Sequence, residues 1–500
     1  MSARTLGEDL HAAAVGDPER IALVDGERRL SYRELDQLIE GVAAGLRELG
    51  VGRGDRVSIV LPNGVGAAVA IYGVLRAGAA FSPLNPTIKR EKLGHVLADS
   101  GAAAVLCDDE RAETVRAAVE LAGEIPIVTD VEALARSESE GDTAPRPVSV
   151  DLAAVIYTSG STGDPKGVTL THANMTFAAD SIIEYLGMQG SDVVLCVLPL
   201  SFDYGLYQLL MSMRIGATLV LEPNFAFPGR VVQLLEAEQV TGLPGVPTVF
   251  QVLLSLRGLA DRELPALRFL TNTGAALPEP TVQAIRKTFP NARLYSMYGL
   301  TECKRATYLP PDQLAARPTS VGIPIPGTEA WVEDEQGNRL APGDVGELMI
   351  RGGHVMQGYW GDPEATAERL RPGRWPWERV LASGDLFRTD EEGYLYFVGR
   401  RDDLIKSGGE KVVPREVEDV LHAAAGVREA AVVGVPDRLL GQAVHAHVSP
   451  HADAELEEAM LRAHCASQLE DHMVPRRIVL HDELPRTSNG KIDKQALAQP

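Results

Sequence analysis

The sequence predicts an α/β protein with a large N-terminal domain and a smaller α+β domain at the C-terminus. From Asp55 to about Ala443, short apolar runs alternate with longer helical patterns. This alternation is typical of βαβ units, in which helices cover both faces of mostly parallel sheets. After Trp331 the pattern changes to short strands separated by turn residues, which predicts a small β-rich subdomain. From Asp402 onward a separate pattern of strands and helices predicts the C-terminal domain.

The predicted elements of the large domain follow one another in a regular order. The clearest strand and helix segments are RVSIVLP (56–62), AAVAIYGVLRAG (67–78), AAAVLC (102–107), RAETVRAAVELAG (111–123), IPIV (125–128) and AAVIYTS (153–159). A charged stretch with prolines at 137–147 separates the last two segments. We interpret it as a solvated surface loop between two subdomains.

The C-terminal segments alternate in a similar way. They are PREVEDVLHAAAG (414–426), VREAAVVGVP (427–436), AVHAHVSP (443–450), ELEEAMLRAHCASQLED (455–471) and RRIVLH (476–481), which predict helix, strand, strand, helix and strand. About one hundred residues with this pattern can bury a small core. We therefore predict a large domain over residues 1–400 and a small domain over residues 401–500.

Composition and charge exclude several classes of function. The chain has 69 acidic and 48 basic residues, a net charge of −21, which repels both nucleic acid and anionic lipid. We expect neither as a partner. The four cysteines are far apart in sequence, which makes a metal knuckle or a disulfide framework unexpected. Together with an N-terminus that lacks a signal-peptide pattern, this predicts a cytoplasmic protein without a membrane span.

One loop carries the densest chemical signal. The segment YTSGSTGDPKG (157–167) directly follows an apolar run. Its glycines let the backbone approach a ligand, its hydroxyls donate hydrogen bonds and its lysine supplies a cation, so the loop suits a polyphosphate. It is not a Walker A loop, because Pro165 and Gly167 stand where that motif needs Gly and Ser or Thr. The candidate ATP-binding residues here are Thr158, Ser159, Gly160, Ser161, Thr162, Gly163 and Lys166.

With this loop the sequence resembles the adenylate-forming superfamily, which includes acyl-CoA synthetases, adenylation domains of nonribosomal peptide synthesis and firefly luciferase. The family's phosphate loop reads YTSGSTGxPKGV, and residues 157–168 match every fixed position. The family's further motifs occur in the same order as LRAGAAFSPLNP (75–86), YGLTE (298–302), SGDL (383–386), GRRDDLIKSGGEKV (399–412) and PRTSNGKIDK (485–494). The resemblance therefore covers almost the whole chain.

The resemblance implies a reaction in two steps, with ATP and Mg²⁺ as cofactors. A carboxylate is a poor electrophile, so an acid first attacks the α-phosphate of ATP and pyrophosphate leaves, while Mg²⁺ offsets the accumulating negative charge. A thiol then attacks the acyl adenylate. The thiol belongs either to the phosphopantetheine arm of a separate carrier protein or to CoA.

The family's site residues can be carried over position by position. Glu302 is implied as the Mg²⁺ ligand, with Thr301 beside it near the α-phosphate. The implied adenine-binding residues are Gly274, Ala275, Tyr298 and Gly299. Asp385 is implied to bind the ribose hydroxyls with Arg400 close by, across a predicted hairpin. For Gly274 and Ala275 a plain strand-to-helix turn, and for Asp385 a turn residue, remain alternatives.

The C-terminal domain is implied to be a mobile lid that carries the catalytic cation. Lys491 matches the lysine whose charge bridges carboxylate and α-phosphate in the first step. Asp402 matches the hinge at which relatives rotate this domain between the two steps. Gly408 and Gly409 match the loop that faces the incoming thiol arm, with a simple β-turn as the alternative.

The identity of the acid depends on Asp203. This residue matches the aspartate that pairs with the substrate amine in amino-acid-activating relatives, but Asp is also a favoured N-cap for the helix that follows. Tyr204, Gly205 and Leu300 depart from the amino-acid pattern. After Glu302 come two cations, which either steer anionic groups or are solvated loop charges. These are Lys304 and Arg305.

Three functions remain open on the sequence alone. The first is activation of a small carboxylic acid, such as proline or a β-amino acid, and its transfer to a separate carrier protein. The second is an acyl-CoA synthetase that releases a free CoA thioester. The third is an inactive nucleotide-binding regulator, which the joint presence of the implied catalytic side chains disfavours.

Overall fold

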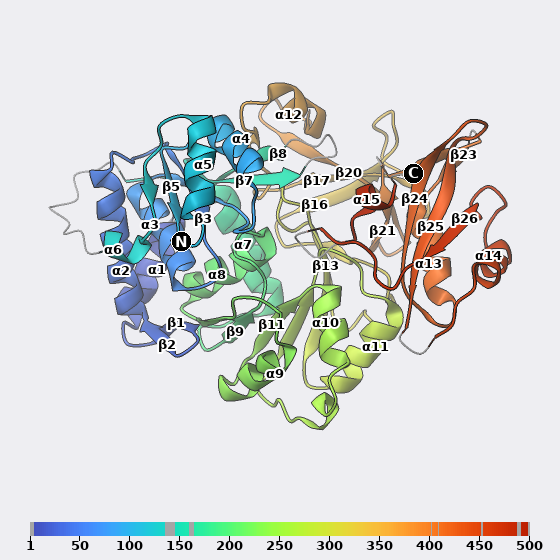
Figure 1. Cartoon of the computed structure of the whole chain (residues 1–500), viewed down its shortest axis with the longest axis horizontal. Coiled ribbons are helices and arrows are strands. Elements are labelled where there is room, and N and C mark those ends of the chain that lie inside the picture. Colours follow the sequence, from blue (N-terminus) through green and yellow to red (C-terminus); the bar gives the residue numbers. More distant parts are fainter. Residues whose placement is uncertain are drawn as a thin grey trace. The chain divides into compact units, whose positions relative to one another are not determined.

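The computed structural model describes residues 5–135, 146–159, 165–401, 403–408, 410–451, 454–487 and 492–498. Contacts divide the chain into two compact units. Unit 1 comprises Met1–Ala330 and Ile350–Ala382, and unit 2 comprises Trp331–Met349 and Ser383–Pro500. Figure 1 labels their helices and strands.

The first sheet of unit 1 has seven strands in the order β18-β8-β7-β4-β3-β5-β6. Their bounds are β3 (Arg56–Val60), β4 (Ala80–Pro83), β5 (Ala104–Cys107), β6 (Ile127–Val128), β7 (Leu152–Ser159), β8 (Pro165–Thr171) and β18 (Gly358–Tyr359). The strands from β7 to β6 pair in parallel, whereas β8 and β18 are antiparallel. Buried apolar side chains of β5 pack against those of α4 (Arg90–Ser100) and α5 (Ala112–Ala122).

The second sheet of unit 1 has nine strands in the order β15-β14-β13-β12-β11-β9-β10-β1-β2. Their bounds are β1 (Ile21–Asp25), β2 (Arg28–Ser31), β9 (Val193–Cys196), β10 (Thr218–Leu221), β11 (Gly242–Gly245), β12 (Phe269–Asn272), β13 (Arg293–Tyr298), β14 (Thr307–Leu309) and β15 (Ile323–Pro324). The six strands from β13 to β1 are parallel. Their carboxyl ends therefore meet at one edge, where the loops after β9, β12 and β13 begin.

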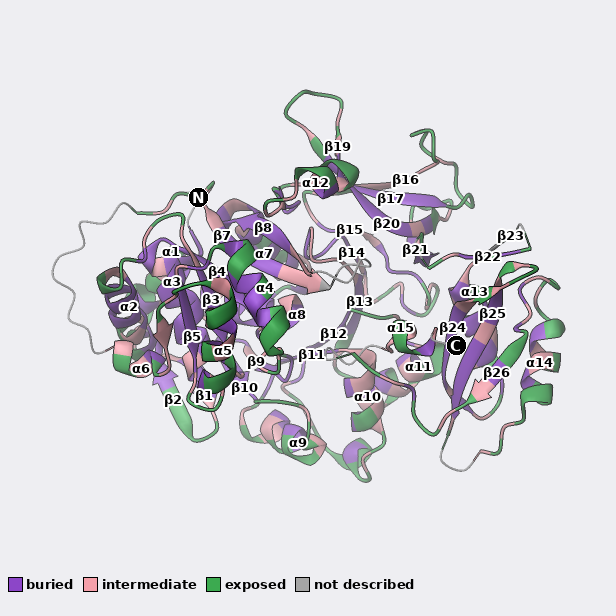
Figure 2. Ribbon diagram, turned by 45° about the horizontal axis from the view of Figure 1, so that its top comes forward, coloured by how far each residue is buried: buried purple, intermediate pink, exposed green. Residues whose placement is uncertain are grey.

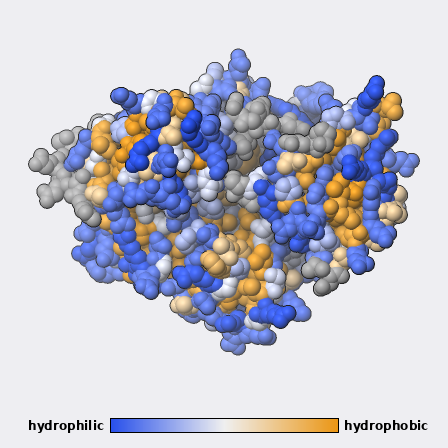
Figure 3. All heavy atoms as spheres, in the orientation of Figure 1, coloured by the Kyte–Doolittle hydropathy of each residue, from blue (hydrophilic) through white to orange (hydrophobic). Residues whose placement is uncertain are grey.

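Helices surround both sheets. Those of unit 1 not yet given are α1 (Leu6–Gly16), α2 (Tyr32–Glu48), α3 (Val65–Ala77), α6 (Val131–Leu134), α7 (His172–Leu186), α8 (Asp203–Ile215), α9 (Pro228–Ala237), α10 (Pro247–Leu254), the 3₁₀ turn Leu259–Asp261, α11 (Glu279–Thr288) and α12 (Pro363–Arg369), with strand β19 (Leu370–Pro372) after it. In Figure 2 the strands are mostly purple, that is buried, and the outer faces of helices are green. Hydrophilic residues cover much of the surface in the view of Figure 3, as expected for a folded protein in water.

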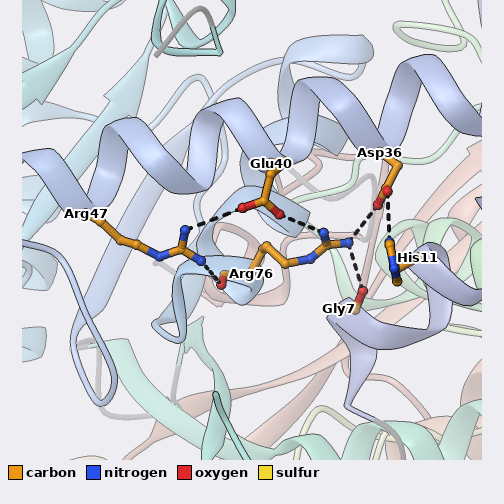
Figure 4. Close-up of polar contacts among 6 residues, drawn as sticks. All are labelled: Gly7, His11, Asp36, Glu40, Arg47 and Arg76. Carbon is orange, nitrogen blue, oxygen red and sulfur yellow. Dashed lines mark hydrogen bonds and ion pairs between the residues drawn. The ribbon is translucent and has the colours of Figure 1, made fainter. Parts of the chain in front are cut away.

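A network of ion pairs connects the first three helices (Figure 4). Arg76 of α3 donates to Glu40 at 2.9 Å and to Asp36 at 2.8 Å, both on α2, and to the carbonyl oxygen of Gly7 on α1 at 3.3 Å. Arg47 donates to the carbonyl oxygen of Arg76 at 2.9 Å. The three helices are thus connected through one largely buried guanidinium.

Unit 2 contains the predicted C-terminal fold. Its elements are β16 (Glu329–Glu333), β17 (Gly346–Arg351), β20 (Arg379–Thr389), β21 (Leu395–Arg400), β22 (Ile405–Ser407), β23 (Glu410–Val412), α13 (Pro414–Ala423), β24 (Val427–Asp437), β25 (Gly441–Pro450), α14 (Glu458–Ala466), β26 (Arg477–Leu480) and α15 (Lys494–Leu497); the chain enters or leaves unit 1 within β16, β17 and β20. The strands from β22 to β26 form one sheet, with the order β23-β22-β25-β24 and with β26 beside β25. A core of apolar side chains from α13, α14 and the sheet fills its interior.

The fold class and the order of predicted elements are confirmed. The compact units divide the chain differently from the predicted domains, because residues 331–349 and 383–400 belong to unit 2. A domain boundary at 400/401 that permits movement stays a prediction. Within the described residues we find no helix with the length and apolar character that crossing a membrane requires.

Candidate active site

The predicted phosphate loop connects two paired strands. Thr158 of β7 lies opposite Lys166 of β8, and Tyr157 lies opposite Gly167. A Cβ atom on Gly167 would lie 2.8 Å from Cγ1 of Val155, so glycine is required there by packing. The loop residues Gly160, Ser161, Thr162 and Gly163, and the side chain of Ser159, lie outside the described residues. The predicted strand ahead of the loop is confirmed, and a second strand follows it.

A tyrosine connects the phosphate-loop lysine with the predicted metal ligand. The Nζ atom of Lys166 lies 3.8 Å from Oδ2 of Asp362 and 5.5 Å from the ring centre of Tyr359. The hydroxyl of Tyr359 donates to Oε1 of Glu302 at 2.7 Å. Burial, reinforced by Glu302, raises the pKa of Tyr359 well above its ordinary value, so the phenol stays a neutral donor. Tyr359 thus orients the Glu302 carboxylate.

Sequence reasoning missed Tyr359. It lies in β18, whose pairing with β8 aligns Tyr359 with Val168 and places Tyr359 beside the phosphate-loop hairpin. The same segment is connected to the YGLTE loop, because the backbone N–H of Met356 donates to the carbonyl oxygen of Glu302 at 2.8 Å. The available signal was the strand-like Gly-Tyr-Trp sequence at 358–360, but its partner strand is almost two hundred residues away in sequence.

The donors at Glu302 fit a magnesium ion. In the described part of the chain, no three His, Cys, Asp or Glu side chains lie close enough together to hold a metal by themselves. Mg²⁺ usually binds one or two carboxylates together with water and substrate phosphates. A single carboxylate beside a phosphate-loop lysine is therefore a suitable donor set for Mg²⁺ bound with ATP.

The predicted adenine-binding residues lie at the carboxyl ends of β12 and β13. Gly274, with a φ of +86°, and Ala275 form an exposed turn in which the Asn272 side chain donates to the carbonyl oxygen of Ala275 at 2.9 Å. Tyr298 is the last residue of β13. A Cβ atom on Gly299 would lie 2.2 Å from the carbonyl oxygen of Lys304, so the loop that contains Thr301 and Glu302 turns back tightly on itself.

Asp203 is the first residue of α8, and the N-cap is Phe202, which makes no side-chain cap. The alternative that Asp203 is itself the N-cap is therefore wrong by one residue. The departure from the amino-acid pattern at Gly205 has a packing reason, because a Cβ atom there would lie 2.2 Å from the carbonyl oxygen of Pro199. Packing of the chain before α8 thus requires this glycine.

The carboxylate of Asp203 already has a cationic partner. The Nζ atom of Lys304 lies 3.5 Å from Oδ2 of Asp203, and the Lys304 side chain is only 3% exposed. Nζ also lies 4.7 Å from the ring centre of Tyr207 and 5.4 Å from that of Tyr204. Burial lowers the pKa of Lys304 to about 7, an effect that Asp203 opposes and Arg305 reinforces.

Arg305 is buried beside this pair. Its Nη1 atom donates to Oγ1 of Thr273 at 2.6 Å, and its guanidinium lies 5.3 Å from the ring centre of Tyr204. Its Nε atom is buried and has no hydrogen-bond partner among the described residues. The alternative that Lys304 and Arg305 are solvated loop charges is therefore wrong, because both are almost fully buried.

Unit 2 brings together two further predicted residues. Asp385 of β20 lies opposite Arg400 of β21, with Oδ1 and Nε 3.7 Å apart, as the predicted hairpin requires. Gly408 follows β22 with a φ of +63°, and its N–H donates to the carbonyl oxygen of Leu440 at 2.9 Å, so it has the turn conformation that we gave as the alternative. The predicted hinge Asp402, thiol-channel Gly409 and catalytic Lys491 lie outside the described residues.

Comparisons with known proteins show which family the chain resembles. A sequence model described as "AMP-binding enzyme" matches residues 10–360, and one described as "AMP-binding enzyme C-terminal domain" matches residues 416–491. A feruloyl-CoA synthase of an Amycolatopsis species is 36% identical over 480 residues, which cover 95% of each chain. Surfactin synthase subunit 2 of Bacillus subtilis is 32% identical over 493 residues, 97% of this chain and 14% of that protein. The ATP-bound structure of MatB from Rhodopseudomonas palustris superposes with a TM-score of 0.91 at 29% identity, covering 100% of this chain and 98% of that one.

Proposed function

The chain belongs to the AMP-binding enzyme family of adenylate-forming acid–thiol ligases, and from this premise we propose its substrate and the roles of its residues. We propose that it couples a small carboxylic acid to AMP, releases pyrophosphate and transfers the acyl group to a phosphopantetheine thiol. The observation that carries this proposal is the arrangement of Lys166, Tyr359 and Glu302 next to the phosphate-loop hairpin.

In the first step the acid carboxylate attacks the α-phosphate of ATP. Lys166 contacts the phosphates as a fixed cation, and Glu302, oriented by Tyr359, would hold Mg²⁺. Bound there, Mg²⁺ offsets the negative charge on the phosphates. The adenine is held by Gly274, Ala275, Tyr298 and Gly299. Thr301 lies near the α-phosphate. The ribose is bound by Asp385 together with Arg400. Lys491 supplies the second cation for the first step. The C-terminal domain then rotates about Asp402, which removes Lys491 from the site and lets the thiol approach past Gly408 and Gly409.

We propose CoA as the acceptor thiol. This choice is supported by the feruloyl-CoA synthase, which matches the chain over nearly its full length. A second candidate is transfer of an amino acid, such as proline or a β-amino acid, to a separate carrier protein. The observation favouring it is the position of the Asp203 carboxylate at the start of α8. An inactive regulator is disfavoured, because Lys166, Glu302, Asp385 and Lys491 are all retained.

The proposal is tested by following ATP-dependent thioester formation across a panel of small acids, with CoA or a phosphopantetheinylated carrier protein as acceptor. We expect AMP, pyrophosphate and an acyl-CoA to form in equal amounts. Lys166→Ala should abolish most of this activity, whereas Lys287→Ala, at an exposed lysine of α11, should not change it. Thioester formation only on the carrier protein would favour the second candidate, and formation of neither thioester would contradict the proposal.

A further inference from the structure

The contact between Lys304 and Asp203 bears on which acids the enzyme accepts. In the second candidate function, Asp203 receives the amine of an amino acid. In the structure an ammonium group from the protein itself occupies that side of the carboxylate, because Nζ of Lys304 lies 3.5 Å from Oδ2 of Asp203. We propose that Lys304 takes the place of a substrate amine, so that the enzyme activates carboxylic acids that lack an amine at this position. This inference rests on the proposed function and names its substrate class.

The charge balance around Asp203 supports the proposal. Asp203 already pairs with the buried Lys304, and the buried guanidinium of Arg305 lies near the Tyr204 ring that Lys304 also contacts. A substrate ammonium would add a further cation to this buried cluster, where little water remains to solvate it. A neutral or anionic substrate group adds no such repulsion. The site is therefore electrostatically selective against amines, in addition to the space that the Lys304 side chain fills.

The backbone holds Lys304 in this position. Its φ of +61° lies in the left-handed region, which a residue with a side chain adopts only where the surroundings enforce it. The enforcing contact is the close return of the chain past Gly299, where no Cβ atom would fit. The Tyr204 and Tyr207 rings lie within cation–π distance of Nζ. Lys304 is thus fixed at Asp203 rather than free to swing away when an amine arrives.

The alternative is that the pair only stabilises the fold. If the pair were purely structural, breaking it would lower the activity of the enzyme toward all acids equally. A residue that substitutes for a substrate amine predicts something different. When its ammonium is removed, acids that carry their own amine should gain relative to matched acids without one, because Asp203 is left buried without its partner. The ratio of the two activities therefore separates the explanations.

The experiment measures kcat/KM for pyrophosphate exchange by the full-length enzyme with matched pairs of acids. The pairs are propanoate with β-alanine, butanoate with 4-aminobutyrate, cyclopentanecarboxylate with proline, and 3-ethylbenzoate with 3-(aminomethyl)benzoate, in all of which the amine is protonated at neutral pH. The variants are Lys304→Ala, which removes the charge and leaves room for an amine, and Lys304→Met, which removes the charge but keeps the volume. Lys287→Ala is the control on an exposed lysine.

We expect the wild-type enzyme to prefer the amine-free member of each accepted pair. Lys304→Ala should shift that ratio toward the amine by about 100-fold, the scale of a broken buried ion pair, and Lys304→Met should shift it less. A wild-type preference for amines, or an unchanged ratio in a folded, active Lys304→Ala enzyme, would overturn the inference. If Lys304→Ala does not fold, the wild-type preference and the Lys304→Met ratio decide in the same way. Absence of exchange with every acid would instead contradict the proposed function itself.

Discussion

Replacement of Tyr359 by phenylalanine tests whether this tyrosine positions the metal ligand. The change keeps the ring beside Lys166 and removes only the hydroxyl that donates to Glu302 at 2.7 Å. Hydrogen bonds to charged groups contribute about 1.5–3 kcal/mol. At 1.36 kcal/mol per decade, this corresponds to a loss of about 10- to 150-fold in the rate of adenylation at limiting Mg²⁺.

The assay is pyrophosphate exchange as a function of Mg²⁺ concentration. Because the hydroxyl acts through Glu302, Tyr359→Phe should raise the Mg²⁺ concentration needed for half-maximal rate, and excess Mg²⁺ should recover part of the loss. Tyr396→Phe is a matched control, since its hydroxyl also donates to a carboxylate, Asp390, at 3.1 Å, in the β20–β21 hairpin. An unchanged Mg²⁺ dependence in Tyr359→Phe would refute the reasoning.

Three further predictions concern the two steps and stability. Lys491→Ala should slow adenylation by roughly 100- to 1,000-fold but leave thioester formation from a supplied acyl adenylate largely intact; equal loss in both half-reactions would exclude a cation needed only once. Asp402→Pro should spare adenylation more than thioester formation, because proline fixes φ where rotation is proposed, and unchanged thioester formation would place the hinge elsewhere. Burial lowers the pKa of the His172 imidazole to about 4. As pH falls below about 6.5, the imidazole of the unfolded chain is protonated before that of the folded chain. The free energy of unfolding should therefore fall as pH decreases from about 6.5 to about 4. In denaturant titrations His172→Gln should show a weaker dependence over this range, and an identical pH profile would contradict the assigned pKa shift.

The alternation of apolar runs and helical patterns was sufficient to predict the fold class. Strands buried on both faces are short, mostly apolar segments, as in β3 and β5, and helices of 13 and 11 residues, α3 and α4, alternate with them. The division into compact units was not predictable in the same way. Residues 331–349 are distant in sequence from the C-terminal segments with which they form unit 2, and local patterns do not report such contacts.

The candidate site was predictable where its motifs are continuous in sequence. The hairpin around the phosphate loop and the pairing of Asp385 with Arg400 follow from local patterns. The contacts of Lys304 and Tyr359 come from strands and helices far apart in the chain. The sequence offered steering of anionic groups or solvated loop charges as the alternatives for Lys304 and Arg305. Their burial depends on contacts with Tyr207 of α8 and with Thr273, which follows β12. Tyr359 acquires its role through the pairing of β18 with β8.

The central claim is that the acid carboxylate attacks the α-phosphate of ATP before a thiol takes the acyl group. The most direct test uses an accepted acid labelled with ¹⁸O in both carboxylate oxygens, together with ATP and CoA, and mass spectrometry of every product. We predict that one labelled oxygen leaves with AMP when the thiol attacks, that the other stays in the thioester, and that pyrophosphate is unlabelled. Formation of ADP with labelled phosphate, or of AMP without the label, would contradict the account.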